Sequence, residues 1–157
     1  DSLWALDILG ELGFEYDSSV FPVRHPQYGI PDAAIAPGAL ELSNGNSIVE
    51  FPPSVVAFGG LRLPISGGGY FRQLPYSLFA AALRRVLSAK QRPVVFYMHP
   101  WEVDPLQPRA NVAWVSRWRH YTNLDKFEPR LARLLGEFSF APMRDVLVGM
   151  KLLPARH

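Results

Sequence analysis

Apolar and polar positions follow a helical period in some segments of the chain and an extended period in others. Apolar residues recur at helical spacing in residues 1–12, 75–89 and 124–135, which predicts three amphipathic helices. Shorter apolar runs bounded by glycine or proline predict strands. They lie at residues 14–17, 47–51, 55–58, 61–65, 92–98 and 138–140. A final turn or two of helix is expected at residues 142–147.

The most informative run is residues 92–104, with the sequence RPVVFYMHPWEVD. Five consecutive apolar residues, β-branched and aromatic, are typical of a fully buried strand, and such strands occur mainly in covered parallel sheets. His99 follows at the carboxyl end, where α/β folds place their chemistry. Pro100 has no N–H to donate, so strand pairing should stop there.

The order of the elements predicts an α/β fold. Residues 1–19 read as a helix capped by Ser2, a glycine turn, a strand and a polar tip, which is the rhythm of a βα repeat. Residues 23–66 are rich in proline and short strands, with turn signals at Asn44-Gly45 and Gly59-Gly60, and predict a β-rich insertion. We expect a single domain over residues 1–157.

Composition narrows the possible functions. The chain of 157 residues is 48% hydrophobic and 19% charged, as expected for a globular domain. A formal charge of +2 does not favour a nucleic-acid partner. The absence of cysteine excludes disulfides, thiolate metal sites and a cysteine nucleophile. No apolar run reaches the ~20 residues of a membrane span, and no signal peptide is visible, so we expect a cytoplasmic location.

His99 leads the candidate functional residues. At a strand end it suits a general acid or base, or a metal ligand, because imidazole titrates near neutral pH. The structural alternative is a histidine packed under Trp101 and capping backbone groups. Glu102 and Asp104 either orient His99 or bind a cation, or form an exposed acidic loop.

Other candidates gather at loops. Asp17, with Ser18 and Ser19, follows another strand and either lines the same pocket or forms a turn. Residues 66–72 predict a glycine-rich loop, in which Gly67–Gly69 let backbone approach a ligand while Arg72 grips it, unless the loop is only a tight turn.

The aromatic residues also have two interpretations. Tyr70 and Trp101 offer faces for sugar stacking, although core aromatics need no such role. Residues 114–121, WVSRWRHY, favour a basic helix face with buried tryptophans. No GxSxG elbow is present, which disfavours a serine hydrolase.

Together these residues resemble a known family. The pattern is LGFEYDSSVFP…GIPD…EFPPS…GGGYFR…RPVVFYMHPWEVD…RHYTNLDKFE…PMRDVL. It is similar to the NodB-like polysaccharide deacetylases, carbohydrate esterase family four, and most of all to their exopolysaccharide- and exosortase-associated subgroup. The resemblance implies a distorted (β/α) barrel that removes acetyl groups from an N-acetylated polysaccharide. It also implies a divalent metal such as zinc, held by one Asp and two His, which polarises the amide carbonyl and activates water.

The resemblance assigns roles by position. His99 matches the catalytic acid that protonates the leaving amine. Tyr97 stands where the family has a leucine lining the acetyl pocket, and Asp17 falls in the fourth motif, which orients catalytic groups. Tyr70 and Arg72 match groove positions; Trp101 and Glu102 are placed in the groove beside them.

The family's base Asp and metal ligands would precede residue 1, and no HxxxH pair occurs here. We therefore expect this chain to be the carboxyl-terminal part of such an enzyme, inactive alone and without a catalytic zinc. The alternative is a non-catalytic carbohydrate-binding or interaction module on the same scaffold.

Overall fold

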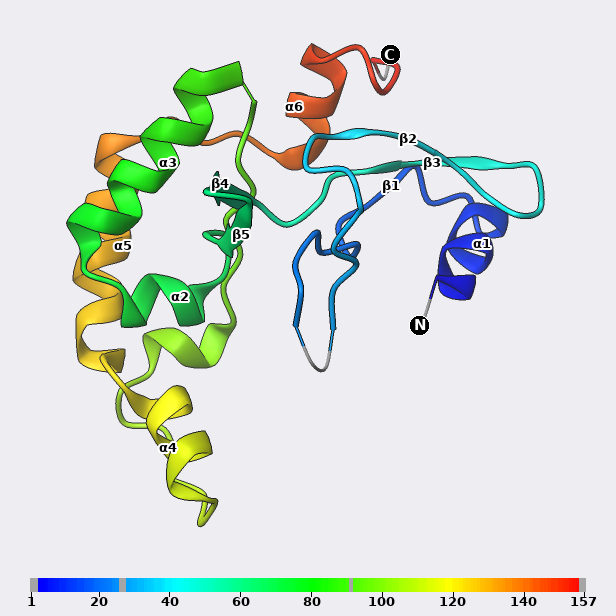
Figure 1. Ribbon diagram of the computed structural model, residues 1–157. Coiled ribbons are helices and arrows are strands. Elements are labelled where there is room, and N and C mark those ends of the chain that lie inside the picture. Colours follow the sequence, from blue (N-terminus) through cyan, green and yellow to red (C-terminus); the bar gives the residue numbers. More distant parts are fainter. Residues whose placement is uncertain (1–2, 26–27, 91, 156–157) are drawn as a thin grey trace.

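The computed structural model describes residues 3–25, 28–90 and 92–155 as a mixed α/β fold with two small open sheets (Figure 1). Its first half contains α1 (Trp4–Glu11), β1 (Tyr16–Asp17), β2 (Gly38–Glu41), β3 (Ser47–Glu50), β4 (Val55–Phe58) and β5 (Leu61–Pro64). Its second half contains α2 (Gly68–Gln73), α3 (Tyr76–Lys90), η1 (Pro100–Val103), α4 (Trp114–Tyr121), η2 (Leu124–Lys126), α5 (Phe127–Glu137) and α6 (Met143–Gly149), where η marks a 3-10 helix.

The larger sheet has the order β1-β3-β2. Its β1 and β3 strands run parallel and place Asp17 opposite Glu50, whereas β2 and β3 form an antiparallel hairpin. Gly45 turns that hairpin with a φ of 83°, a conformation that favours glycine. The β4–β5 hairpin forms the second sheet. Both predicted hairpin turns are confirmed, and so is the α/β class, but the described residues form no closed barrel.

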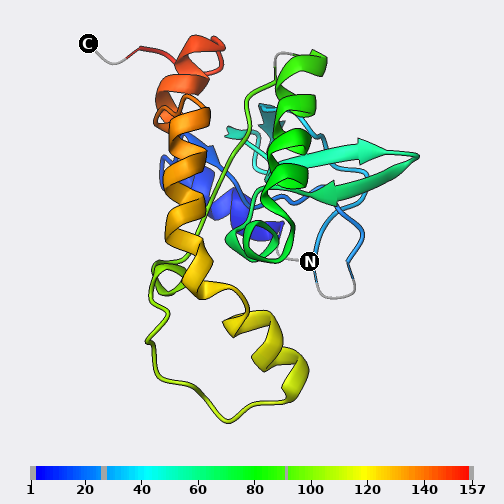
Figure 2. The ribbon, with the colours of Figure 1, turned by 90° about the vertical axis from the view of Figure 1, so that its left-hand side faces the viewer.

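The main core lies between α2, α3 and α5. Phe71 is fully buried, and its ring meets Phe79, Phe96 and Phe127 edge to face at centroid distances of 4.8, 5.1 and 5.4 Å. Edge-to-face rings add about 0.5–1.5 kcal/mol per pair beyond their buried area. Figure 2 shows the extended segment 92–98 passing between α3 and α5. The core therefore holds the chain up to Met98, the residue before His99.

The segment 92–98 is not the fully buried strand that the apolar run predicts. It is half-buried and makes one isolated bridge, Tyr97 with Gly67. The Val95 N–H donates instead to the Ser54 hydroxyl, at 2.9 Å. Alternate side chains pack in opposite directions: Val94, Phe96 and Met98 against the main core, and Val95 against the cluster around Phe51 and Leu147. Continuous apolarity here reflects two separate cores, and no sheet covers the segment.

Three further expectations need correction. Residues 66–72 are not a loop throughout, because α2 begins at Gly68. Residues 138–140 form no strand: Phe138 ends α5 and its ring lies 5.2 Å from the Arg84 guanidinium. The tryptophans of α4 are exposed rather than buried.

The remaining helices are confirmed, with Pro75 directly before α3. The predicted cap Ser2 lies outside the described residues. In the part of the chain that the structure describes, no helix has the length and apolarity needed to cross a bilayer.

Candidate functional site

A cavity of about 400 Å³ lies where α2, η1 and α4 meet. Six of the seven residues that the resemblance placed in the site line it: Tyr70, Arg72, Tyr97, His99, Trp101 and Glu102. The other lining residues are Tyr28, Gly67, Gly68, Gly69, Gln73, Ser116, Arg119 and His120. His99 itself is exposed, so its ring faces solvent in this cavity rather than the packed interior.

The floor of the cavity is a buried ion pair between α2 and η1. Arg72 is 2% exposed and Glu102 is 0% exposed, and Arg72 Nε donates to Glu102 Oε1 at 2.9 Å. Burying such a pair is costly unless other groups satisfy its remaining atoms. The structure meets this condition on both sides of the pair.

The other donors of Arg72 point at the carboxyl end of α4. Nη1 donates to the carbonyls of His120 and Thr122, at 3.0 and 2.8 Å, and Nη2 to that of Arg119 at 3.4 Å. The last carbonyls of a helix have no partner within it, and a cation there complements the helix dipole. Arg72 therefore docks α4 onto the cavity, and its guanidinium donates to protein acceptors.

The other carboxylate oxygen of Glu102 fixes the backbone at His99. Oε2 accepts from the His99 N–H at 2.9 Å, and the Glu102 N–H donates to the His99 carbonyl at 2.9 Å. Pro100 opens the short helix η1 that creates this geometry. Gly68 leaves room for the carboxylate, because a Cβ there would lie 2.6 Å from Glu102 Cδ. Of the two roles weighed for Glu102, the structure supports orientation of His99.

Three aromatic rings, those of His99, Trp101 and His120, form a row in the cavity. The His99 ring stacks on Trp101 with centroids 5.8 Å apart, and Trp101 stacks on His120 at 4.0 Å. His120 Nε2 lies 3.1 Å from Gln107 Oε1. Tyr97 meets His99 edge to face at 6.3 Å. These contacts limit how far the imidazole can rotate out of the cavity.

Two phenols line the cavity beside this row. Tyr70 Oη lies 3.1 Å from Tyr28 Oη. Burial, followed by the contact with Tyr28, raises the pKa of Tyr70, and burial also raises the pKa of Tyr97. Both phenols are neutral near pH 7 and can donate hydrogen bonds.

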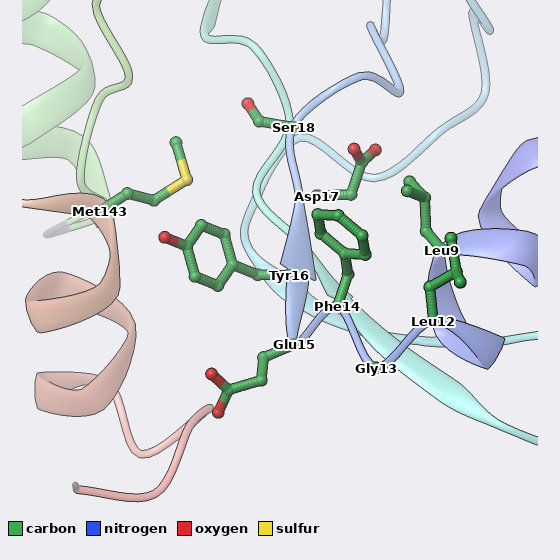
Figure 3. Close-up of a pocket in the computed structure, with 9 residues that line it drawn as sticks. All are labelled: Leu9, Leu12, Gly13, Phe14, Glu15, Tyr16, Asp17, Ser18 and Met143. Carbon is green, nitrogen blue, oxygen red and sulfur yellow. The ribbon is translucent and has the colours of Figure 1, made fainter.

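Asp17 does not join the His99 cavity. It lines a separate hollow of about 590 Å³ between α1, β1 and Met143 (Figure 3). Its carboxylate accepts from the Ser19 N–H at 3.0 Å and from the Ser19 hydroxyl. The turn-forming alternative for Asp17 thus describes its observed contacts.

Beside Asp17 lies a carboxyl that sequence reasoning missed. Glu50 is buried, and its Oε1 accepts from the Val20 N–H at 3.0 Å. Burial, with the neighbouring Asp17 carboxylate as the next cause, raises the pKa of Glu50 to about 8. The Glu50 carboxyl at the end of β3 is therefore mainly protonated near neutral pH.

The described residues do not fit a resident metal ion. Among them, no three His, Cys, Asp or Glu side chains converge as a metal site requires. At the floor of the cavity, both Glu102 oxygens already accept hydrogen bonds from protein donors.

Comparison with known proteins identifies a family. A protein-family profile described as "Domain of unknown function (DUF3473)" matches residues 18–148. This chain belongs to the DUF3473 family. Neither the curated proteins nor the solved structures contain a match.

The DUF3473 match spans the whole lining of the His99 cavity, from Tyr28 to His120. It begins one residue after Asp17. The cavity, rather than the hollow at Asp17, is therefore the site that lies wholly inside the family's domain.

Several lining residues of the DUF3473 domain were not predicted from sequence. Ser116, Arg119 and His120 enter because Asn123, in the left-handed region at φ 56°, turns the chain after α4, while its amide donates to the Arg72 carbonyl at 2.9 Å. An Asn after a helix is a recognisable turn signal. The direction of the turn has no signal in the local pattern.

Proposed function

We propose that this chain supplies the acid side and part of the sugar groove of a metal-dependent deacetylase acting on N-acetyl groups of an exopolysaccharide in the cytoplasm. The observation that carries the proposal is the setting of His99. Its ring is exposed in a cavity, its backbone is held by the buried Glu102, and its face rests on Trp101. The sequence resemblance to NodB-like polysaccharide deacetylases supports the same role.

The proposed chemistry of His99 is one proton transfer. As the amide C–N bond breaks, the sugar nitrogen takes a proton from the imidazolium, so that a neutral amine leaves and a neutral imidazole remains. Holding the donor in place before the reaction lowers the entropic cost of that step. Glu102 and Trp101 do this from the backbone and from the ring, respectively.

The remaining lining residues suit a sugar. A volume of about 400 Å³ is within the range of small-ligand pockets. Tyr70 and Tyr97 present neutral phenols, and Trp101 lines the cavity beside them while its ring stacks with His99 and His120. Arg72 contributes by holding α4 against the cavity.

The barrel and the metal belong to the same proposal. The parallel pair β1–β3 is the part of the larger sheet that a (β/α) barrel would contain. We propose that the other strands, the base Asp and the metal ligands come from residues outside the described ones. The metal, when bound there, would polarise the amide carbonyl.

The test is acetate release from an N-acetylated polysaccharide by the natural protein that carries this chain. His99→Ala and His99→Asn should lower kcat by about 100- to 10,000-fold, the usual range for a general acid. Glu137→Gln, on the outer surface of α5, is the control and should behave as wild type. Full activity in both His99 variants would exclude this role.

A second candidate is a non-catalytic carbohydrate-binding module. The observation that favours it is the donor set: within the described residues no metal site assembles beside the cavity. The module predicts that an N-acetylated oligosaccharide binds and that no acetate is released. It also predicts that His99→Asn leaves the affinity unchanged, while Trp101→Ala lowers it.

A further inference from the structure

A second concavity lies on the outer side of α4. It has a volume of about 280 Å³ and is lined by Arg109, Trp114, Arg117, Trp118, Tyr121 and Thr122. Figure 2 shows α4 and the loop that precedes it extending away from α3 and α6. None of these six residues lines the His99 cavity.

The two tryptophan side chains that line it are largely exposed to solvent. Trp114 is 78% exposed and Trp118 is 53% exposed, and α4 contains no buried residue. The residues stand four positions apart and so share a helix face. Large exposed aromatics rimmed by polar groups mark interaction sites, because leaving them in water forfeits the free energy of burial.

The charge around these tryptophans has one sign. Residues 105–124 contain three arginines, Arg109, Arg117 and Arg119, and no Asp or Glu. The whole chain carries a formal charge of only +2, so this segment holds a local excess of positive charge. An arginine fork matches a carboxylate with two parallel hydrogen bonds.

The concavity is formed before any ligand arrives. The Tyr121 hydroxyl accepts from the Ala110 N–H at 2.8 Å and donates to the Pro108 carbonyl at 3.4 Å. The Arg109 guanidinium lies 5.1 Å from the Tyr121 ring. These contacts hold the loop against α4, so binding does not have to order it first.

The same helix joins the two cavities. Ser116, Arg119 and His120 line the His99 cavity, while Arg117, Trp118 and Tyr121 line the outer one. A polymer that is bound at His99 and extends past α4 would reach the outer concavity. The concavity is shallow and open, and its aromatic and guanidinium side chains offer both a stacking surface and donors for a carboxylate, which a single acidic sugar ring would match.

We infer that the concavity formed by Trp114, Trp118, Arg109 and Arg117 is a distal subsite for a carboxylate-bearing sugar unit of an acidic polysaccharide. The inference rests on the proposed function, because it assumes that a polysaccharide occupies the His99 cavity. The tryptophans stack on the ring and the arginines bind its carboxylate. The subsite would select acidic polymers over neutral ones.

The experiment measures binding of tetragalacturonate and of a neutral N-acetylated chitotetraose to the chain by calorimetry. We expect tetragalacturonate to bind, and Arg117→Gln and Trp118→Ala each to weaken it by about tenfold or more. Neither substitution should alter chitotetraose binding. Trp4→Ala and Arg85→Ala, which remove an exposed tryptophan and an exposed arginine elsewhere, are the matched controls and should change neither. Circular dichroism and thermal melts establish that each variant is folded.

Equal affinity of all variants for tetragalacturonate, or no binding by the wild type, would overturn the subsite. So would binding to phosphatidylserine vesicles that Trp114→Ala abolishes, with no effect on sugar binding, because that result would make α4 a membrane contact. Selective tetragalacturonate binding without acetate release by the natural protein would retain the subsite and remove the deacetylase. Acetate release that depends on His99 but not on Trp118 or Arg117 would retain the deacetylase and remove the subsite.

Discussion

The two oxygens of Glu102 serve two different partners: one accepts from Arg72 Nε and the other from the His99 N–H, each at 2.9 Å. One buried carboxylate thus links α2, the His99 backbone and, through Arg72, the end of α4. The geometry of the cavity depends on this single residue more than on any loop around it.

Removing the charge of Glu102 should destabilise the fold. Glu102→Gln leaves the Arg72 guanidinium buried without its counter-ion, and breaking such a pair costs about 3–5 kcal/mol. Urea denaturation followed by circular dichroism measures this loss. Glu137→Gln removes the carboxylate shared by two exposed pairs, with Arg84 and Arg133, and should lower the midpoint far less. Equal midpoints for the two variants would mean that the buried pair does not hold the site.

Two adjacent glycines of α2 should respond oppositely to alanine. In Gly68→Ala the new Cβ overlaps the Glu102 carboxylate, so either α2 or the ion pair must shift and stability falls. In Gly69→Ala the Cβ meets nothing within 4 Å, and alanine should raise helix stability by up to about 1 kcal/mol. Thermal melts of the two variants give the comparison. A stabilised Gly68→Ala variant would contradict the close approach of Glu102.

Alanine at Gly67 tests the shape of the cavity separately from the fold. Its Cβ would lie 2.7 Å from the Tyr97 hydroxyl, which is the far end of a side chain that can swing aside. Gly67→Ala should therefore change the melting temperature less than Gly68→Ala does. It should also raise the dissociation constant of an N-acetylated oligosaccharide, because Tyr97 lines the cavity. Unchanged sugar affinity would place Tyr97 outside the binding surface.

Glu50 should make the stability of the fold decrease with pH. Its folded-state pKa of about 8 exceeds the ordinary value of 4.5, so the folded chain holds the proton more tightly than the unfolded chain. The resulting stabilisation is complete below pH 4.5 and is lost as the pH rises through about 8. Glu50→Gln, which cannot ionise, should therefore melt at the higher temperature at pH 8.5 and show a flatter profile.

The control for that profile is Glu41→Gln, an exposed position in the same sheet that leaves Glu50 in place. It should keep the wild-type dependence on pH between 5 and 9. Parallel profiles for wild type and Glu50→Gln would show that Glu50 ionises alike in the folded and unfolded chains.

Local signals in the sequence anticipated the elements better than their partners. Gly45 and Pro75 predicted a turn and a helix start, because their backbone restrictions act wherever they stand. The apolar run before His99 predicted a sheet that is not there. A segment packed between two cores and a strand buried in a sheet have the same run of apolar residues, and only the tertiary packing distinguishes the two.

The sequence predicted most residues that line the cavity, but not the contacts that bring them together. His99, Trp101 and Tyr70 were found because their chemistry is visible in the sequence. The pairing of Arg72 with Glu102 joins residues thirty positions apart, and no local period reports such a contact. The exposure of Trp118 was missed because apolar character alone favours burial, whereas α4 meets the cavity chiefly through its end and its polar residues.

The alternating side chains of the segment 92–98 have a consequence for how the molecule unfolds. Phe96 packs in the main core and Val95 in the cluster at Leu147, so one stretch of backbone contributes side chains to both clusters. Unfolding of either cluster would release this segment and so remove a packing partner from the other cluster. The two clusters should therefore unfold in one transition, and His99, which follows the segment 92–98, should lose its position in the same transition.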